Sequence, residues 1–196
     1  VDEGIGLVRN SIPLFESLSP LQLREFLLDS EIHSLAEGTS LIEYNDYTNT
    51  FFTVLQGTVK VKIKPSDTEP SLKLGTGKFV GEMSLISGRR RSTSVFAGSD
   101  CVVIETPRRS MNKLINSNES VKRTIDEAFM IRAIKMHLAP EVKEEHLAEI
   151  VKNATLEKFE ANQELFKEGD QGDSLYLVRS GSVTVSKSIG EKSTTL

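Results

Sequence analysis

The stretch of sequence that decides the fold is Phe79-Val80-Gly81-Glu82-Met83-Ser84-Leu85-Ile86-Ser87-Gly88-Arg89-Arg90-Arg91-Ser92-Thr93-Ser94-Val95. It predicts a one-turn helix from Glu82 to Ser87, then a basic turn that leads into a β-strand. Backbone N–H groups at a helix start attract an anion, and an arginine adds a full charge with paired donors. The stretch therefore predicts a site for one phosphate group. Glu82 would repel a phosphate, so we expect this carboxylate to accept hydrogen bonds from sugar hydroxyls.

This stretch resembles the phosphate-binding cassette of cyclic nucleotide-binding domains, the family of the cAMP-dependent protein kinase regulatory subunits and the catabolite activator proteins. The first half of the family's pattern matches residues 81–85, and the second half matches residues 91–95. The resemblance implies that Arg91 pairs with the cyclic phosphate and that Glu82 binds the ribose. Two departures are an extra Val80 before the glycine and Arg90 where many members have proline.

The resemblance also implies the remaining ligand-binding residues. The full predicted set is Gly81, Glu82, Met83, Ser84, Arg91, Ser92, Thr93, Val61, Val80 and Phe129. Met83, Ser84 and Ser92 would donate backbone N–H groups to the phosphate, and the base would be enclosed by Val61, Val80, Met83, Thr93 and Phe129. The ligand would be cAMP or cGMP, and Ser92 after the phosphate arginine favours cAMP. The alternative is that Arg89-Arg90-Arg91 is only a solvated basic turn.

The sequence around this stretch predicts many short β-strands. Residues 51–63 alternate between apolar and polar side chains on both sides of Gly57, which predicts a β-hairpin. The predicted strands are Glu31–Ala36, Leu41–Tyr44, Thr50–Leu55, Thr58–Lys64, Ser71–Leu74, Thr93–Phe96 and Cys101–Glu105. Strands at this spacing predict a mainly β chain of the α+β class. The resembled family narrows this to a double-stranded β-helix or jelly-roll barrel between N-terminal helices and a long C-terminal helix.

Helices are predicted on both sides of the strands. Ser19-Pro20 is a typical helix start, with serine as the cap and proline at the first helical position. A long helix over residues 118–138 carries a stripe of Val121, Ile125 and Phe129, which predicts one buried face. The stripe is explained by simple packing on the β-unit. In the resembled family the same helix also moves over the bound nucleotide, which implies a switch between two packings.

An internal repeat follows the long helix. The glycine-centred pattern of residues 45–61 recurs at residues 169–185, with every matched pair separated by 124 positions. This predicts a cyclic nucleotide-binding domain over residues 8–137 and an incomplete second copy over residues 138–196. The second copy has no cassette in the sequence, so we expect it to bind no nucleotide. Its apolar residues Leu165, Phe166, Tyr176 and Val178 would be exposed, unless the first domain or another chain covers them.

Composition and charge exclude several classes of function. The 196 residues are 38% hydrophobic and 27% charged with a formal net charge of −4, which disfavours direct nucleic-acid binding. No apolar run is long enough to span a membrane. The single Cys101 lies in an apolar strand, which favours a buried structural thiol, and the three scattered histidines indicate no metal site.

No nucleophile–base pair indicates an enzyme or a bound cofactor. We therefore expect a cytoplasmic regulatory module that binds a cyclic nucleotide and signals to an effector, with homo-oligomers formed through the long helix or the second copy. Two alternatives remain from the sequence. One is a non-binding copy of the fold that acts as a protein-interaction module. The other is the sensor part of a transcription regulator.

Overall fold

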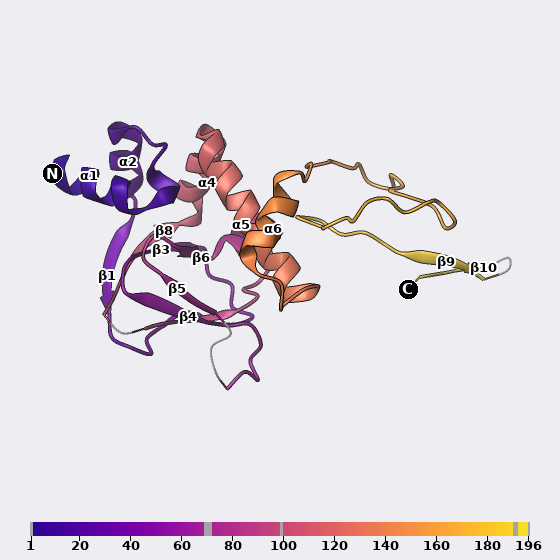
Figure 1. The fold of residues 1–196 in the computed structure, drawn as a ribbon, viewed down its shortest axis with the longest axis horizontal. Coiled ribbons are helices and arrows are strands. Elements are labelled where there is room, and N and C mark those ends of the chain that lie inside the picture. Colours follow the sequence, from indigo (N-terminus) through magenta and orange to yellow (C-terminus); the bar gives the residue numbers. More distant parts are fainter. Residues whose placement is uncertain (1, 69–71, 99, 190–191, 196) are drawn as a thin grey trace.

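The computed structural model describes residues 2–68, 72–98, 100–189 and 192–195 (Figure 1). Its helices are α1 (Asp2–Ser11), η1 (Pro13–Phe15), α2 (Pro20–Leu28), α3 (Glu82–Ser87), α4 (Arg108–Ser117), α5 (Glu119–His137) and α6 (Glu144–Lys152). Its strands are β1 (Glu31–Leu35), β2 (Ser40–Ile42), β3 (Thr50–Gln56), β4 (Thr58–Lys62), β5 (Leu72–Gly75), β6 (Phe79–Val80), β7 (Ser94–Ala97), β8 (Cys101–Pro107), β9 (Ser186–Ile189) and β10 (Lys192–Thr195). Helices thus flank a β-unit, as the sequence predicts.

The helix starts follow the predicted capping residues. The Ser19 side chain accepts a hydrogen bond from the Gln22 backbone at 3.2 Å, and Gln22 reaches back to the Ser19 N–H at 2.9 Å, which together form a capping box. Asn118 caps α5 in the same way by accepting from the Val121 N–H at 3.0 Å. Helix α1 was not predicted from the sequence, because its two glycines, Gly4 and Gly6, are poor helix formers.

The eight strands of residues 31–107 form two four-stranded sheets, with strand orders β1-β8-β3-β6 and β2-β7-β4-β5. All pairs are antiparallel, and each of β1 to β4 bonds only to strands among β5 to β8. The prediction that residues 51–63 form a β-hairpin is therefore wrong. Strands β3 and β4 lie in different sheets, and Gly57, with φ of 75°, lets the chain turn from one sheet to the other.

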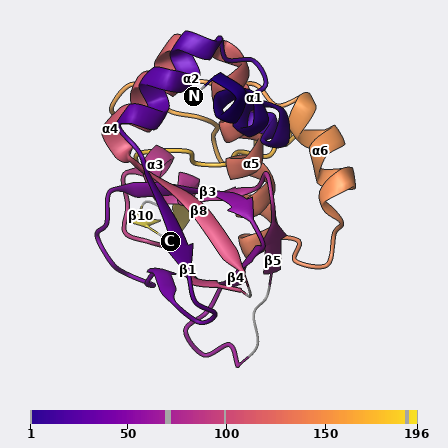
Figure 2. The same cartoon turned by 90° about the vertical axis from the view of Figure 1, so that its left-hand side faces the viewer.

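Two clusters of buried side chains hold these layers together. The first joins the helices to the outer face of the β3-containing sheet through Phe51, Phe79 and Ile104. The second lies between the two sheets and includes Val54 and Val59. Strand β3 is buried on both faces, because helices cover one side and the second sheet covers the other (Figure 2). The cysteine prediction is confirmed, since the Cys101 side chain is buried and 1% exposed.

We call residues 156–196 the C-terminal segment. Up to Ser186 its described part forms no strand, yet its turns repeat those of the first repeat at the 124-residue spacing. Positive φ angles occur at Asn162, Gly169 and Gly181, and their counterparts Gly38, Asn45 and Gly57 have them too. Two backbone hydrogen bonds in turns also recur at this spacing. The N–H of residue 39 donates to the carbonyl of residue 36, as residue 163 does to residue 160. The N–H of residue 46 donates to the carbonyl of residue 43, as residue 170 does to residue 167.

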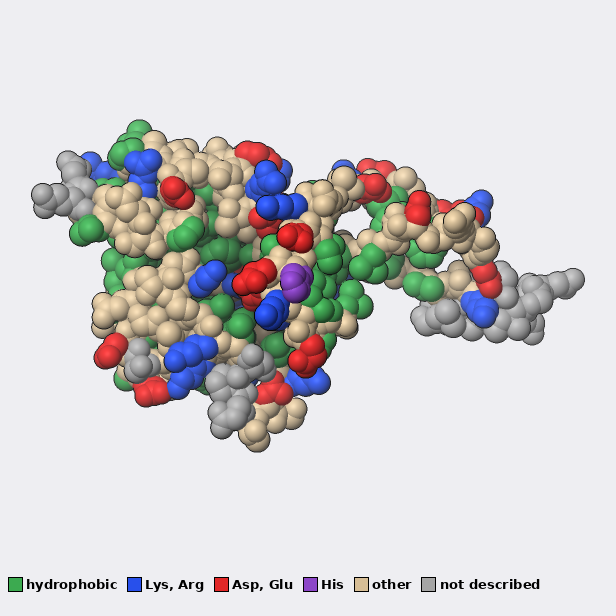
Figure 3. All heavy atoms as spheres, in the orientation of Figure 1, with side chains coloured by type: hydrophobic (Ala, Val, Ile, Leu, Met, Phe, Trp, Pro, Cys, Tyr) green, Lys and Arg blue, Asp and Glu red, His purple; other side chains and the backbone are tan. Residues whose placement is uncertain are grey.

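The missing strands have a physical reason. At the 124-residue spacing, residues 155–186 correspond in sequence to β1 to β4, whose partners in the first repeat are β5 to β8. Apolar side chains are left at the surface as a result (Figure 3), as predicted for Phe166, Tyr176 and Val178, whereas Leu165 is half-buried. The counterparts of the three exposed residues, Ile42, Phe52 and Val54, all lie in the first-repeat core. The described helices include none with the length and apolar character of a membrane span.

Candidate functional site

A cavity of about 540 Å³ opens between the β4-containing sheet, α3 and the end of α5. This volume is in the range of small-molecule sites. Nine of the ten predicted site residues line it, namely Val61, Val80, Gly81, Glu82, Met83, Ser84, Arg91, Ser92 and Thr93. Phe129 is not among the lining residues, because it belongs to the buried stripe of α5 with Val121 and Ile125.

Helix α3 begins at the wall of this cavity, and a glycine makes that position possible. Gly81 has φ of 102°, in the left-handed region that glycine favours. A Cβ atom there would lie 3.0 Å from the Arg91 Nη1 atom and 3.0 Å from the Thr50 carbonyl oxygen. The N–H groups of the first helical turn, including those of Met83 and Ser84, have no intrahelical acceptor. The helix ends at Ser87 and is followed by Gly88, whose φ of 70° lets the chain turn into the basic turn.

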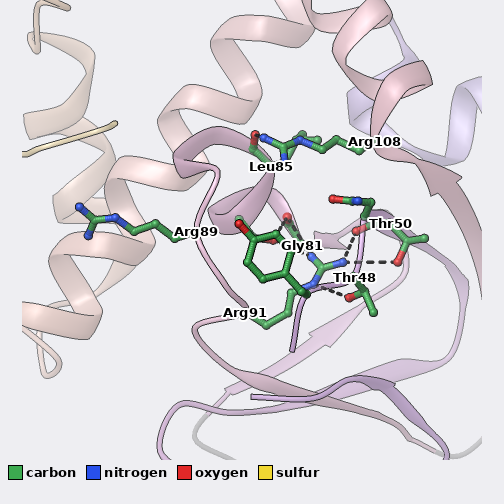
Figure 4. Close-up of a pocket in the computed structure, with 10 residues that line it drawn as sticks. Thr48, Thr50, Gly81, Leu85, Arg89, Arg91 and Arg108 are labelled. Carbon is green, nitrogen blue, oxygen red and sulfur yellow. Dashed lines mark hydrogen bonds between the residues drawn. The ribbon is translucent and has the colours of Figure 1, made fainter. Parts of the chain in front are cut away.

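Arg91 is 4% exposed, and its guanidinium is held entirely by oxygen atoms of the protein (Figure 4). Nε donates to the Thr48 hydroxyl at 2.8 Å. Nη1 donates to the Ser84 hydroxyl at 2.8 Å and the Gly81 carbonyl at 3.3 Å. Nη2 donates to the carbonyl and hydroxyl oxygens of Thr50 at 2.6 and 3.4 Å. Five oxygen atoms of the protein therefore accept from the donors of this one guanidinium.

Charges around Arg91 act in both directions. Burial lowers the pKa of the guanidinium, the nearby carboxylates of Asp46 and Glu82 raise it, and the Arg108 cation lowers it. Because an arginine pKa starts so high, the side chain keeps its charge. The site thus holds a buried, preoriented cation. A small hollow of about 10 Å³ on the other side of Arg91, between Thr48, Thr50 and Arg108, has room for about one water molecule (Figure 4).

Glu82 is 1% exposed and is paired with a residue that the sequence did not single out. Arg132 Nη1 lies 2.6 Å from Glu82 Oε2 and forms an ion pair. Arg132 also donates to the Phe79 carbonyl at 2.9 Å, and its guanidinium lies 5.2 Å from the centre of the Phe79 ring. Glu82, which the sequence predicts to bind the ribose, is therefore joined to α5 by an ion pair.

Sequence reasoning missed the far side of the cavity. It is formed by Arg132, Lys135, Met136, Pro140, Glu141 and Glu144, from α5, the turn after it and the start of α6. The Lys135 amine holds this turn by donating to the Val142 carbonyl at 3.0 Å. The sequence did hold a partial signal for this side of the cavity. Arg132 and Met136 are four positions apart and therefore lie on the same face of the predicted helix. The chosen residue, Phe129, belongs to the neighbouring stripe that packs in the core.

The site contains no arrangement typical of metal binding. Within the part of the chain that the structure describes, no three His, Cys, Asp or Glu side chains lie together as metal ligands would. What the cavity offers is a buried guanidinium and a buried carboxylate, with apolar strand residues between them. This combination suits a ligand with one anionic group, one set of hydroxyls and one flat apolar part.

Comparisons with known proteins found a matching family model and several relatives. The family model described as cyclic nucleotide-binding domain matches residues 32–118 and 156–196. The cAMP-dependent protein kinase regulatory subunit of Eremothecium gossypii is 27% identical over 153 residues, which is 78% of this chain and 32% of that protein. The chain thus spans about a third of that curated relative.

Two solved structures have a similar fold. The co-crystal structure of the regulatory domain of Toxoplasma gondii PKA with cAMP matches with a TM-score of 0.55 and 21% identity, covering 77% of this chain and 59% of that one. The regulatory subunit of a cAMP-independent protein kinase A from Trypanosoma brucei matches with a TM-score of 0.57 and 16% identity, covering 71% of this chain and 47% of that one. Because both identities are low, these two matches show a similar fold and nothing more.

Proposed function

The chain belongs to the cyclic nucleotide-binding domain family, and we propose that it binds one cyclic nucleotide in the 540 Å³ cavity as a regulatory rather than catalytic module. The observation that carries this proposal is the convergence of Arg91 and Glu82 on one cavity beside the start of α3. Arg91 and the N–H groups of Met83, Ser84 and Ser92 would bind the cyclic phosphate. Glu82 would accept a hydrogen bond from the ribose hydroxyl.

Binding requires Arg91 to exchange partners. Its contacts to the Gly81 carbonyl and the Thr50 hydroxyl, at 3.3 and 3.4 Å, are longer than ordinary hydrogen bonds of this type. A phosphate oxygen replaces these contacts at a net gain, because two charged partners form the stronger bond. The shorter bonds to Thr48 and Ser84 can keep the guanidinium in place during the exchange.

The same geometry supports a coupling between occupancy and the position of α5. Arg132 joins that helix to Glu82, and Met136 lines the cavity from the same helix. A ligand that hydrogen-bonds Glu82 competes with the ion pair and contacts the helix directly. Occupancy would then shift the packing of α5 against the β-unit, and an effector would respond to that shift.

We favour cAMP as the ligand over cGMP. Ser92 lines the cavity, and relatives named for cAMP dependence match most of this chain. The Trypanosoma brucei protein with a similar fold is named cAMP-independent, so the fold alone does not decide the ligand. Direct titration of both nucleotides decides it.

The C-terminal segment is proposed to be the front half of a second domain, within residues 138–196, that binds no nucleotide. Its turns repeat those of the first repeat, and the family model matches it separately. We expect one bound nucleotide per chain. A cytoplasmic location and an effector protein as partner stay predictions.

Isothermal titration calorimetry of the chain with cAMP and cGMP tests the proposal. Replacing Arg91 with alanine should weaken binding by about 10- to 150-fold, because a hydrogen bond to a charged group contributes roughly 1.5–3 kcal/mol. The matched control is Arg90→Ala, since Arg90 is exposed and does not line the cavity. Circular dichroism checks that each variant is folded, and Glu82→Gln provides a second, isosteric change in the site. Equal affinities of the wild type, Arg91→Ala and Glu82→Gln would reject the assignment.

A further inference from the structure

The C-terminal segment returns to the first repeat at residues 179–181 through two polar contacts. Arg179 Nε and Nη2 both donate to Asp126 Oδ1 on α5, at 3.1 and 2.7 Å. Arg89 Nη2 donates to the Gly181 carbonyl at 2.9 Å. The partners are 53 and 92 residues apart in sequence, so these contacts are tertiary. The side chains of Arg179 and Asp126 are 31% and 20% exposed, and salt screens such a pair less than a fully exposed one.

Both contacts involve elements that form the proposed nucleotide site, namely the basic turn and α5. Arg89 lies two residues before Arg91 in the basic turn, and its side chain points away from Arg91 toward another part of the chain (Figure 4). Asp126 lies on α5, the helix whose Arg132 pairs with Glu82. The C-terminal segment therefore touches the two elements that would have to shift when a nucleotide binds.

Comparison of the two repeats shows that one of these contacts uses a side chain found only in the second repeat. Arg179 occupies the position of Leu55, which packs partly buried against the helix-side core of the first repeat. A cation at an apolar position suits a polar partner, and Asp126 provides one. Gly181 matches Gly57 in its positive φ, and its turn presents the carbonyl oxygen that Arg89 binds.

We propose that residues 179–181 act as a clip that favours the arrangement in which Arg91 and Glu82 are bonded to protein groups, and so opposes nucleotide binding, an inference that rests on the proposed function. In this arrangement all three Arg91 nitrogen atoms donate to protein oxygens, and Glu82 is paired with Arg132. Because Arg91 exchanges some of its partners when phosphate binds, a hydrogen bond that anchors Arg89, two residues away, resists any accompanying shift of the basic turn. Linkage makes the effect reciprocal, so a bound nucleotide weakens the clip by the same factor.

Charge reversal at Arg179 tests the clip. Calorimetry of the full chain with cAMP and cGMP should show that Arg179→Glu binds about five-fold more tightly than the wild type, the lower end of typical coupling between sites. The matched control is Lys158→Glu, which makes the same charge change in the same segment at an 88% exposed side chain paired only loosely with Glu160 at 3.5 Å. It should leave the affinity unchanged.

A second variant keeps the test decisive. Exchanging the charges in Arg179→Asp with Asp126→Arg rebuilds the pair and should return the affinity to the wild-type value. Unchanged or weaker binding by Arg179→Glu, with wild-type binding intact, overturns the clip alone. No binding of either nucleotide by the wild type and by Arg179→Glu overturns the proposed function and the clip with it. Binding by Arg179→Glu but not by the wild type supports the clip in its strongest form.

Discussion

Among single residues, Arg91 has two roles that compete for the same N–H groups. Its bonds to Thr48, Thr50 and Ser84 tie the basic turn to β3 and α3, and the proposed phosphate needs some of those donors. Removing this side chain would leave several buried acceptors without partners, each at a cost of roughly 1–3 kcal/mol. Any binding experiment on Arg91 must therefore include a measurement of folding.

Gly81 gives a cleaner prediction at the same scale. Gly81→Ala places a Cβ atom 3.0 Å from Arg91 Nη1 and from the Thr50 carbonyl, at a φ of 102° that alanine disfavours. We expect the free energy of unfolding in urea to fall by about 1–3 kcal/mol and cAMP binding to weaken, because the guanidinium is displaced. Gly172→Ala is the control, since nothing lies within 4 Å of its Cβ position. Wild-type stability of Gly81→Ala would contradict the prediction that the positive φ and the close contacts at this position exclude a side chain.

Single residues also mark how far the sequence could predict the site. The cassette residues were found because glycine, glutamate and arginine have chemically required positions within a local stretch. Arg132 was missed because its role comes from a partner fifty positions away, and a lone arginine on a helix is ordinarily solvated. Pro140 and Glu144 were missed for a related reason, since they approach the cavity only after α6 folds back toward α5.

At the scale of elements, α5 separates a packing face from a ligand face. Phe129 is buried away from the cavity, whereas Met136 lines it. We expect Phe129→Ala to lower the free energy of unfolding by about 3–5 kcal/mol. Met136→Ala should instead weaken nucleotide binding with a smaller loss of stability, because its side chain is only half-buried.

Urea denaturation and calorimetry on both α5 variants check this division. The conservative Phe129→Leu variant should keep the nucleotide affinity of the wild type, which the base-contact role predicted from the sequence would not allow. Weaker binding by Phe129→Leu together with an unaltered affinity of Met136→Ala would reverse the assignment of the two faces.

For the strands, the sequence predicted positions in the chain better than it predicted pairing. Apolar alternation located β3 and β4 to within two residues at their ends, because the period of two is a local property. Their pairing was predicted wrongly, since a glycine turn between two strands fits both a hairpin and a crossing between sheets. Strand β6, Phe79–Val80, escaped prediction because two residues are too few to show any period.

At the scale of the whole molecule, the chain divides into a part with two four-stranded sheets and a part whose strands, β9 and β10, pair only with each other. Every pairing of β1 to β8 lies within residues 31–107, and η1, α4 and α5 contribute to the core on the outer sheet face. None of the residues of the C-terminal segment that the structure describes belongs to either buried cluster. Its contacts with the first repeat include the polar ones at residues 179–181.

This division predicts where the chain can be shortened. A chain that ends at residue 152 should keep the free energy of unfolding within about 1 kcal/mol of the full chain, because the lost polar contacts contribute little at partly exposed sites. A chain that ends at residue 137 should lose roughly 3 kcal/mol or more, because it also lacks α6 with the buried Leu147 and Val151. Urea denaturation followed by far-ultraviolet circular dichroism compares the three chains. If ending the chain at residue 152 were as damaging as ending it at residue 137, the C-terminal segment would have to stabilise the first repeat through contacts that the structure does not place there.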